Sequence, residues 1–298
     1  MTAFASDSAP VLDLAHASKT YGAQPVLRDA SWRIAPGQVI GLLGRNGAGK
    51  STLLEAALGL CDLDGGQASV FGEPASRLSA ATRARIGYVP QQSDLFEWMT
   101  AQQLLAYFKP LYPRWNDAKV EALLARWGFT ALLRNKSIGT LSLGEKQRLS
   151  IVRALAHEPD LLVLDEPVAS LDPVGRRDFL RELVDGVIER GTTVVFSTHI
   201  LSDLERVAMD VAFLHHGAIA LQAPLDELLD SARRITGSAA LLGGMAFKRE
   251  LRRETGADGA LHIIARPDAD ETQRLAQAGA ALRIDALNLE DLFIAVTN

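Results

Sequence analysis

Apolar residues follow two patterns along the first 230 positions: short uninterrupted runs, and longer segments with helical spacing. Val39–Leu43 and Leu161–Leu164 are uninterrupted runs, which are typical of strands buried on both faces of a sheet. Thr192–Phe196 is β-branched and apolar enough to be a neighbouring strand. Pro173–Arg190 lies between the last two and is predicted to be a helix, with its proline in the first turn. Strand, helix and strand in this order predict a parallel sheet with helices packed on it.

The same patterns predict further strands near both ends of this region and helices in its middle. Strands are expected at Val11–Ala15, at Val26–Ile34 and within Ala84–Pro90, with a closing hairpin formed by Val211–Leu214 and Ala218–Leu221. Helices are expected at Gln102–Phe108, Asn116–Trp127 and Glu145–His157, where proline and glycine separate the segments.

The character of the chain changes beyond Asp230. Ser231–Gly244 is rich in small residues and glycine, and we interpret it as a linker. The pattern then predicts strand, helix, strand and helix, at Leu261–Ala265, Asp268–Ala278, Ala281–Ile284 and Leu289–Val296. We therefore divide the chain into a main unit, 1–230, and a C-terminal accessory module of the α+β class, 231–298.

The segment Gly44–Ser51 matches G-x-x-x-x-G-K-[ST], a loop whose backbone N–H groups surround the phosphates of a nucleotide. It follows a predicted buried strand and precedes a predicted helix, whose N-terminal dipole favours an anion. Lys50 is expected to reach the β- and γ-phosphates, and Ser51 to bind Mg²⁺ through its hydroxyl. The expected nucleotide-binding residues are Gly44, Arg45, Asn46, Gly47, Ala48, Gly49, Lys50, Ser51 and Thr52.

Two carboxylates follow the apolar run Leu161–Leu164. Asp165 is placed to hold Mg²⁺, and Glu166 to polarise the water that attacks the γ-phosphate. An isolated Asp-Glu pair could equally be an acidic turn in solvent. The phosphate loop and the preceding strand make hydrolysis the better interpretation.

Composition narrows the function classes further. The formal net charge is -5, so the chain offers no general electrostatic argument for binding nucleic acid or an anionic membrane surface. The single cysteine, Cys61, excludes an internal disulfide. No window approaches the roughly 18 consecutive apolar residues of a membrane span. We expect a soluble intracellular protein unless another chain brings it to a membrane.

Leu141–Arg148, with the sequence LSLGEKQR, resembles the signature of the ATP-binding-cassette (ABC) ATPases, usually written L-S-G-G-Q. Ser142 and Gly144 match the signature, whereas Leu143 replaces its first glycine and Glu145 its glutamine. Without the family, Ser142 and Glu145 simply form a capping box that opens a helix. The resemblance covers about residues 10 to 230.

The resemblance implies an α/β fold, a P-loop NTPase cassette with a RecA-like core. It further implies an antiparallel β subdomain and an α-helical subdomain at about 92–158. By position, Gln91 matches the family's glutamine that contacts Mg²⁺, and His199 the histidine that senses the γ-phosphate. Tyr21 matches the aromatic residue that stacks on adenine, and Asp172 lies in the loop that touches the opposing subunit. The signature residues Ser142, Gly144 and Glu145 would complete the nucleotide site of that second subunit.

The function implied by the resemblance is that of an ATP-hydrolysing subunit that powers a membrane ABC transporter. Its partners would be a permease and a second cassette, identical or homologous, and it would lie on the cytoplasmic face of the cell membrane. The helix predicted at Leu289–Val296 resembles the tails of cassettes that pair with separate ABC-2-type export permeases, which favours export. The helix could also simply close its own domain.

Two other classes stay open as alternatives. A soluble ABC ATPase acting on a ribosome or a nucleic-acid machine usually carries two cassettes or added modules, which this chain lacks. A cassette without turnover is disfavoured because Lys50, Asp165, Glu166 and His199 are all present.

Aromatic residues concentrate in the predicted helical subdomain. Most are expected to form its own core, but we predict that some of Leu95–Trp98 and Tyr107–Trp115 are exposed and face the permease.

Overall fold

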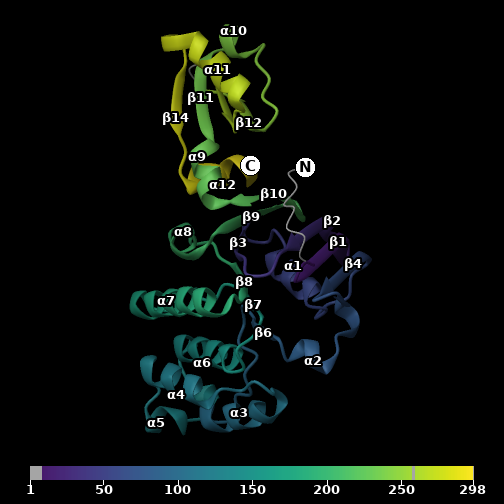
Figure 1. Ribbon diagram of the computed structural model, residues 1–298, viewed down its shortest axis with the longest axis vertical. Helices are drawn as coiled ribbons and strands as arrows, with labels where there is room; N and C mark the ends of the chain where they lie inside the picture. Colours follow the sequence, from purple (N-terminus) through teal and green to yellow (C-terminus); the bar gives the residue numbers. More distant parts are fainter. Residues whose placement is uncertain (1–8, 257–258, 298) are drawn as a thin grey trace.

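The computed structural model describes residues 9–256 and 259–297, so positions 1–8 of the predicted main unit lie outside the described residues. The described residues form three sheets (Figure 1). The central sheet has the order β10-β9-β3-β8-β7-β6. Its strands are β3 (Val39–Leu43), β6 (Ile86–Val89), β7 (Leu161–Leu164), β8 (Thr193–Ser197), β9 (Asp210–His215) and β10 (Ala218–Pro224). All neighbours pair in parallel except β9 and β10, which form the predicted hairpin.

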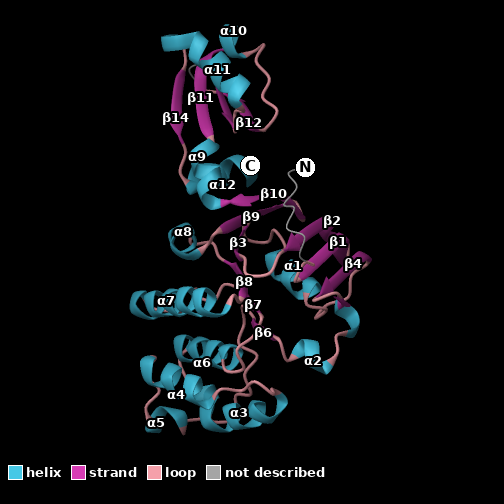
Figure 2. Cartoon of the chain, viewed as in Figure 1, coloured by secondary structure: helices cyan, strands magenta, loops and turns pink. Residues whose placement is uncertain are grey.

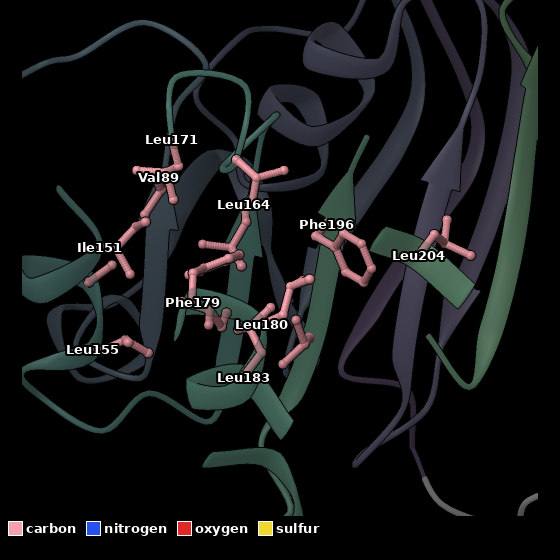
Figure 3. Close-up of a cluster of buried hydrophobic side chains, with 14 of the residues drawn as sticks. Val89, Ile151, Leu155, Leu164, Leu171, Phe179, Leu180, Leu183, Phe196 and Leu204 are labelled. Atoms are coloured by element: carbon pink, nitrogen blue, oxygen red, sulfur yellow. The ribbon is translucent and has the colours of Figure 1, made fainter. Parts of the chain in front are cut away.

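Alternate residues of the central strands face two different cores, which explains their uninterrupted apolar sequences. Ile40 and Leu42 pack against a second sheet and α1 (Lys50–Ala57), while Val39 and Leu43 face the helices on the opposite side. Figure 3 shows part of the core on the helix side of the sheet, where Leu164 and Phe196 lie close to Phe179 of α7 (Pro173–Arg190).

The second sheet is antiparallel, with the order β2-β1-β4-β5. Its strands are β1 (Leu12–Tyr21), β2 (Gln24–Ile34), β4 (Gly65–Val70) and β5 (Glu73–Pro74). The sequence pattern did not reveal β4, because its residues are glycine-rich and mostly polar. The expected RecA-like core and antiparallel β subdomain are both present.

Helices cover the central sheet and build the predicted helical subdomain (Figure 2). They are α2 (Ala80–Arg83), α3 (Ala101–Phe108), α4 (Asp117–Arg126), α5 (Ala131–Arg134), α6 (Leu143–Leu155), α7 (Pro173–Arg190), α8 (Leu201–Val207) and α9 (Leu225–Ser231). Short 3₁₀ helices lie at Ala75–Arg77, Lys109–Leu111, Ile138–Thr140 and Gly279–Ala281. Capping boxes open α3 at Thr100 and α6 at Ser142. No described helix is both long and apolar enough to span a bilayer.

His157 joins the helical subdomain to the central sheet. Its Nε2 lies 3.1 Å from the carbonyl oxygen of Ile86 in β6, and its ring stacks on Tyr112 with the centroids 4.0 Å apart. Nδ1 is buried without a hydrogen-bond partner, which suits a neutral ring that donates through Nε2. Burial lowers the pKa of His157 to about 4.

The third sheet belongs to the C-terminal module and has the order β12-β13-β11-β14. The module contains β11 (Arg233–Ser238), α10 (Ala239–Leu242), β12 (Glu250–Thr255), β13 (Ala260–Ala265), α11 (Ala269–Ala278), β14 (Arg283–Ala286) and α12 (Leu289–Thr297). The interpretation of Ser231–Gly244 as a linker is wrong, because β11 is an inner strand of this sheet. Its one large apolar side chain, Ile235, is fully buried, and a Cβ on Gly237 would lie 2.5 Å from Leu282 Cδ2. From the sequence alone, a glycine required by close packing inside a strand cannot be distinguished from a glycine in a linker.

The terminal helix α12 packs against β9 and α8 of the main unit as well as against β12 (Figure 1). Leu289, Leu292 and Ala295 belong to the same hydrophobic cluster as the central sheet. The boundary at 230/231 is thus bridged by the end of the chain, and the division into two domains stays a prediction.

Replacing Leu292 by alanine should destabilise the main unit, because this fully buried side chain belongs to its core. We expect the free energy of unfolding from urea denaturation to fall by about 2–5 kcal/mol. Ile294 on the same helix is 41% exposed, so Ile294→Ala is the control and should cost much less. Equal stabilities of Leu292→Ala and the wild type would contradict the docking of α12.

The stability of the fold should decrease as the pH falls from about 6.5, the pKa of an unfolded histidine, to about 4. In this window the unfolded chain protonates His157 and the folded chain does not, so protons favour unfolding. This group alone should contribute a loss of about 3 kcal/mol, measured by urea denaturation at pH 7 and pH 4.

The His157→Phe variant keeps a ring against Tyr112 but cannot titrate, so its loss over this window should be smaller. His216→Gln, at an exposed position, is the control and should behave like the wild type. The same loss in His157→Phe as in the wild type would refute the assignment.

Candidate active site at the phosphate loop

The loop Gly44–Ser51 connects β3 to α1, as its sequence predicts. Gly47 and Gly49 have φ angles of 80° and 99°, which side-chain-bearing residues rarely adopt. A Cβ on Gly44 would lie 2.9 Å from the carbonyl oxygen of Leu214, so the backbone needs glycine there as well. Gly49 caps α1 without a side-chain hydrogen bond, which leaves the N–H groups of the first turn available to an anion.

Lys50 is buried at the first position of α1 and is held within the loop itself. Its Nζ donates a hydrogen bond of 2.9 Å to the carbonyl oxygen of Gly44 and lies 3.6 Å from Glu166 Oε1. The ammonium therefore sits between the phosphate loop and the carboxylates, where a bound triphosphate would need a positive charge.

Asp165 and Glu166 lie at the carboxyl end of β7 and are both buried. Glu166 Oε2 lies 2.7 Å from Nδ1 of His199, a residue that follows β8. The Glu166 carboxylate is thus bracketed by Lys50 on one side and His199 on the other. The backbone N–H of Glu166 and the carboxylate of Asp165 both hydrogen bond to the hydroxyl of Ser197.

These groups surround a cavity of about 480 Å³. It is lined by Val26, Asn46, Gly47, Gly49, Lys50, Ser51, Thr52, Gln91, Asp165, Glu166, Ala169 and His199. The structure therefore brings together most of the predicted residues; Gly44, Arg45 and Ala48 belong to the same loop without lining the cavity. The reasoning from sequence missed Val26 and Ala169, which are apolar wall residues without a chemical signature, and Ser197, a common residue type at the end of an ordinary strand.

Five other predicted residues lie apart from both the cavity and the phosphate loop. They are Tyr21 at the end of β1, and Ser142, Gly144, Glu145 and Asp172 near the N-termini of α6 and α7. Burial and the neighbouring Cys61 raise the pKa of Tyr21. The adenine-stacking role of Tyr21 stays a prediction.

The residues at the N-termini of α6 and α7 form a second cluster. Glu145 accepts from the N–H of Ser142 at 2.7 Å, and Ser142 Oγ accepts from the N–H of Glu145 at 3.2 Å, so the predicted capping box is present. Asp172 accepts from Gly175 N at 2.6 Å and from Arg148 Nη2 at 2.9 Å. The Gly175 N–H, with the Arg148 guanidinium, lowers the pKa of Asp172.

The residues near the cavity suit Mg²⁺. Ser51 Oγ lies 3.5 Å from Gln91 Oε1, and Asp165 adds a carboxylate, so the donors are hard oxygen atoms. Burial and the nearby charge of Asp165 raise the pKa of Glu55, the fifth residue after Lys50 in α1. The described residues contain no cluster of three or more His, Cys, Asp or Glu side chains able to hold a metal. One carboxylate together with substrate phosphates is the usual protein environment of Mg²⁺.

A larger hollow of about 730 Å³ lies among α3, α4 and α5. Its floor is apolar, and its rim cations are paired, Lys109 with Asp117 and Arg134 with Glu121. Its lining residues include no glycine-rich loop, and the N-terminus of α5 among them is capped by the Thr130 hydroxyl.

Comparison with known proteins agrees with this geometry. The sequence profile of the ABC transporter family matches residues 27–169. The Nod factor export ATP-binding protein I of Rhizobium etli is 34% identical, over 96% of this chain and 93% of that protein. A solved ATP-binding subunit of an ABC transporter superposes with a TM-score of 0.67 at 28% identity, over 74% of this chain and 92% of that one.

A second solved structure, a dimeric ATP-binding cassette in a post-hydrolysis state with ADP and Pi, has a TM-score of 0.65. It is 24% identical over 72% of this chain and 98% of that one, and it shows the shared fold. With the phosphate loop and its carboxylates in place, these matches establish that the chain belongs to the ABC transporter family, as an ATP-binding subunit that hydrolyses ATP.

Proposed function

We propose that this subunit drives a membrane exporter by hydrolysing Mg²⁺-bound ATP between two cassettes. The observation that carries the proposal is the position of Glu166 in the phosphate-loop cavity. Its buried carboxylate lies between Lys50 Nζ, at 3.6 Å, and His199 Nδ1, at 2.7 Å. A carboxylate held in this way, next to a loop that binds phosphate, can polarise an attacking water.

Three residues of the cavity act on the phosphates or the attacking water in this proposal. Lys50 exchanges its contacts with Gly44 and Glu166 for the β- and γ-phosphates when ATP binds. Glu166 orients the water and accepts its proton. His199 fixes the Glu166 carboxylate through Nδ1, and its half-exposed ring also reaches the cavity.

Ser51, Gln91 and Asp165 are the residues that hold Mg²⁺ in this proposal. When bound, the ion neutralises charge on the phosphate oxygens and orients the terminal phosphate for attack. The protein's own part is to keep three oxygen donors from three separate segments at one edge of the cavity.

The second cluster, Ser142, Gly144, Glu145 and Asp172, requires another subunit, because it lies apart from the cavity of its own chain. The capping box occupies the N–H groups of Ser142 and Glu145 and leaves those of Leu143 and Gly144, together with the dipole of α6, available to an anion. We propose that these residues complete the ATP site of a second cassette. The solved cassette bound to ADP and Pi is itself a dimer, which supports this arrangement.

An exposed group of aromatic side chains marks the surface proposed to face the permease. Phe96, Trp98 and Tyr107 are exposed, as predicted, while Leu95 is buried. Phe96 stacks with Trp98 at 6.0 Å and with Phe108 at 6.3 Å between ring centroids, and Arg153 lies over Phe108 at 5.2 Å. Preorganised, exposed aromatic rings are typical anchors of protein interfaces.

The direction of transport is inferred from a relative, and the location of the subunit from the proposed permease. The Rhizobium etli relative, matched over nearly its full length, is a Nod factor export protein, which supports export here. We infer that the permease holds this subunit at the cytoplasmic face of the membrane. The comparisons offer no support for a soluble ABC ATPase of a ribosome or nucleic-acid machine.

Glu166→Gln should abolish turnover without abolishing ATP binding, because it keeps the shape of the side chain and removes its basicity. We expect ATP hydrolysis to fall by at least about 100-fold, with an ATP-dependent dimer visible by size-exclusion chromatography. Glu121→Gln, on an exposed carboxylate of α4, is the control and should hydrolyse normally. Hydrolysis by Glu166→Gln at the wild-type rate would overturn the role of Glu166.

Trp98→Ala should weaken the association with the membrane subunit by at least about tenfold, as expected for a central aromatic anchor. Copurification from solubilised membranes measures this loss, while ATP binding by the isolated subunit should not change. Leu132 is 73% exposed on the same subdomain, against 76% for Trp98, so Leu132→Ala is the matched control. Undiminished copurification of Trp98→Ala would reject this surface.

A further inference from the structure

Ser197, the last residue of β8, connects the two carboxylate residues of the site. It is fully buried and lies at the carboxyl end of the central sheet. Its Oγ accepts a hydrogen bond of 2.8 Å from the backbone N–H of Glu166 and lies 2.5 Å from Asp165 Oδ1. One hydroxyl thus links the backbone of one residue to the side chain of the other.

The direction of these hydrogen bonds is determined by chemistry. A backbone N–H can only donate, so the Ser197 oxygen accepts from Glu166. The hydroxyl has a single hydrogen, and an ionised carboxylate can only accept, so this hydrogen goes to Asp165. The Ser197 hydroxyl therefore accepts from Glu166 and donates to Asp165, and these two contacts together fix its orientation.

The backbone of Glu166 is strained, and this makes the contact consequential. Its φ angle is 50°, in the left-handed region that a residue with a long side chain seldom occupies. This conformation turns the Glu166 side chain toward Lys50 and His199. The backbone N–H of Glu166 is the group that donates to Ser197. The hydroxyl therefore stabilises the strained backbone conformation of Glu166 through a direct hydrogen bond.

We propose that Ser197 is a positioning residue for ATP hydrolysis, setting the turn at Glu166 and the orientation of the Asp165 carboxylate together. It acts through these two residues without touching the nucleotide, so the inference rests on the roles proposed for them above. Without its hydroxyl, the Glu166 turn relaxes and the Asp165 carboxylate is free to rotate. The first change slows hydrolysis, and the second weakens divalent cation binding.

The same strand supplies a matched control. Thr193, at the opposite end of β8, is as buried as Ser197, and its Oγ1 accepts a 2.9 Å hydrogen bond from the backbone N–H of Gly37. Thr193→Val and Ser197→Ala each remove a buried hydroxyl that accepts from a backbone N–H. Only the second lies beside the carboxylates.

The experiment measures kcat and KM for ATP, and separately the affinity of the ADP-bound protein for Mn²⁺ by electron paramagnetic resonance. For Ser197→Ala we expect kcat to fall about 10- to 100-fold with little change in KM, and Mn²⁺ affinity to fall about tenfold or more. Thr193→Val should match the wild type in both measurements. Wild-type kcat and Mn²⁺ affinity in Ser197→Ala, or equal losses in Thr193→Val, would overturn the inference.

Two further variants make the result decisive. Ser197→Cys replaces the hydroxyl by a thiol that bonds weakly, so it tests the same contact if the alanine variant does not fold. Its kcat should lie below the wild type, and a wild-type kcat would count against the inference. In a Glu166→Gln background, Ser197→Ala should cause no further loss of turnover but should still weaken Mn²⁺ binding.

The outcomes also separate this inference from the proposed function. If Glu166→Gln hydrolyses ATP normally, the role proposed for Glu166 fails whatever Ser197 does. If Glu166→Gln is inactive while Ser197→Ala resembles the wild type, the proposed function stands and the positioning role is rejected.

Discussion

Three charged side chains, Lys50, Asp165 and Glu166, are buried together where the parallel strands β3 and β7 end. A buried charge is tolerated only when it is paired and hydrogen bonded, so the surrounding structure must supply partners. Lys50 donates a hydrogen bond to the carbonyl oxygen of Gly44. Glu166 hydrogen bonds to His199, and the Ser197 hydroxyl hydrogen bonds to both carboxylate residues. The central sheet meets this requirement, because its parallel strands bring their carboxyl ends to one edge.

The proposal of a second cassette rests on how the predicted site residues divide between two places. The cavity is lined by the phosphate loop, Gln91, the carboxylates and His199, while the signature residues are not among its lining residues. Because Ser142 and Glu145 satisfy each other in a capping box, they need no partner from their own cavity. The proposed second cassette thus meets a preformed helix end.

Helix α6 connects the proposed surfaces of the molecule. It begins at the signature, and Arg153 in its last turn lies over Phe108 beneath the exposed aromatic group. Just beyond its end, His157 contacts β6 and stacks on Tyr112. The segment from α6 to His157 thus links the proposed subunit interface, the aromatic surface and the central sheet. The C-terminal module contacts the main unit at another place. Its helix α12 packs on α8, which begins two residues after His199.

The sequence by itself determined the parts whose physics is local. Glycines in a phosphate loop, an apolar run followed by two carboxylates and a capping box each depend on neighbouring residues. The bounds of β3, β7 and α7 were accordingly predicted as they occur.

Only the tertiary structure decided what depends on distant partners. The role proposed for Ser197 depends on Asp165 and Glu166, which lie about thirty residues earlier in the chain. The strand β11 is recognisable only from the neighbours that bury Ile235 and crowd Gly237. The helix α12 was predicted, but the core that it joins is known only from the structure. Burial and pairing across such separations leave no periodic signal in the segment itself, because the partner that makes a residue matter is elsewhere in the chain.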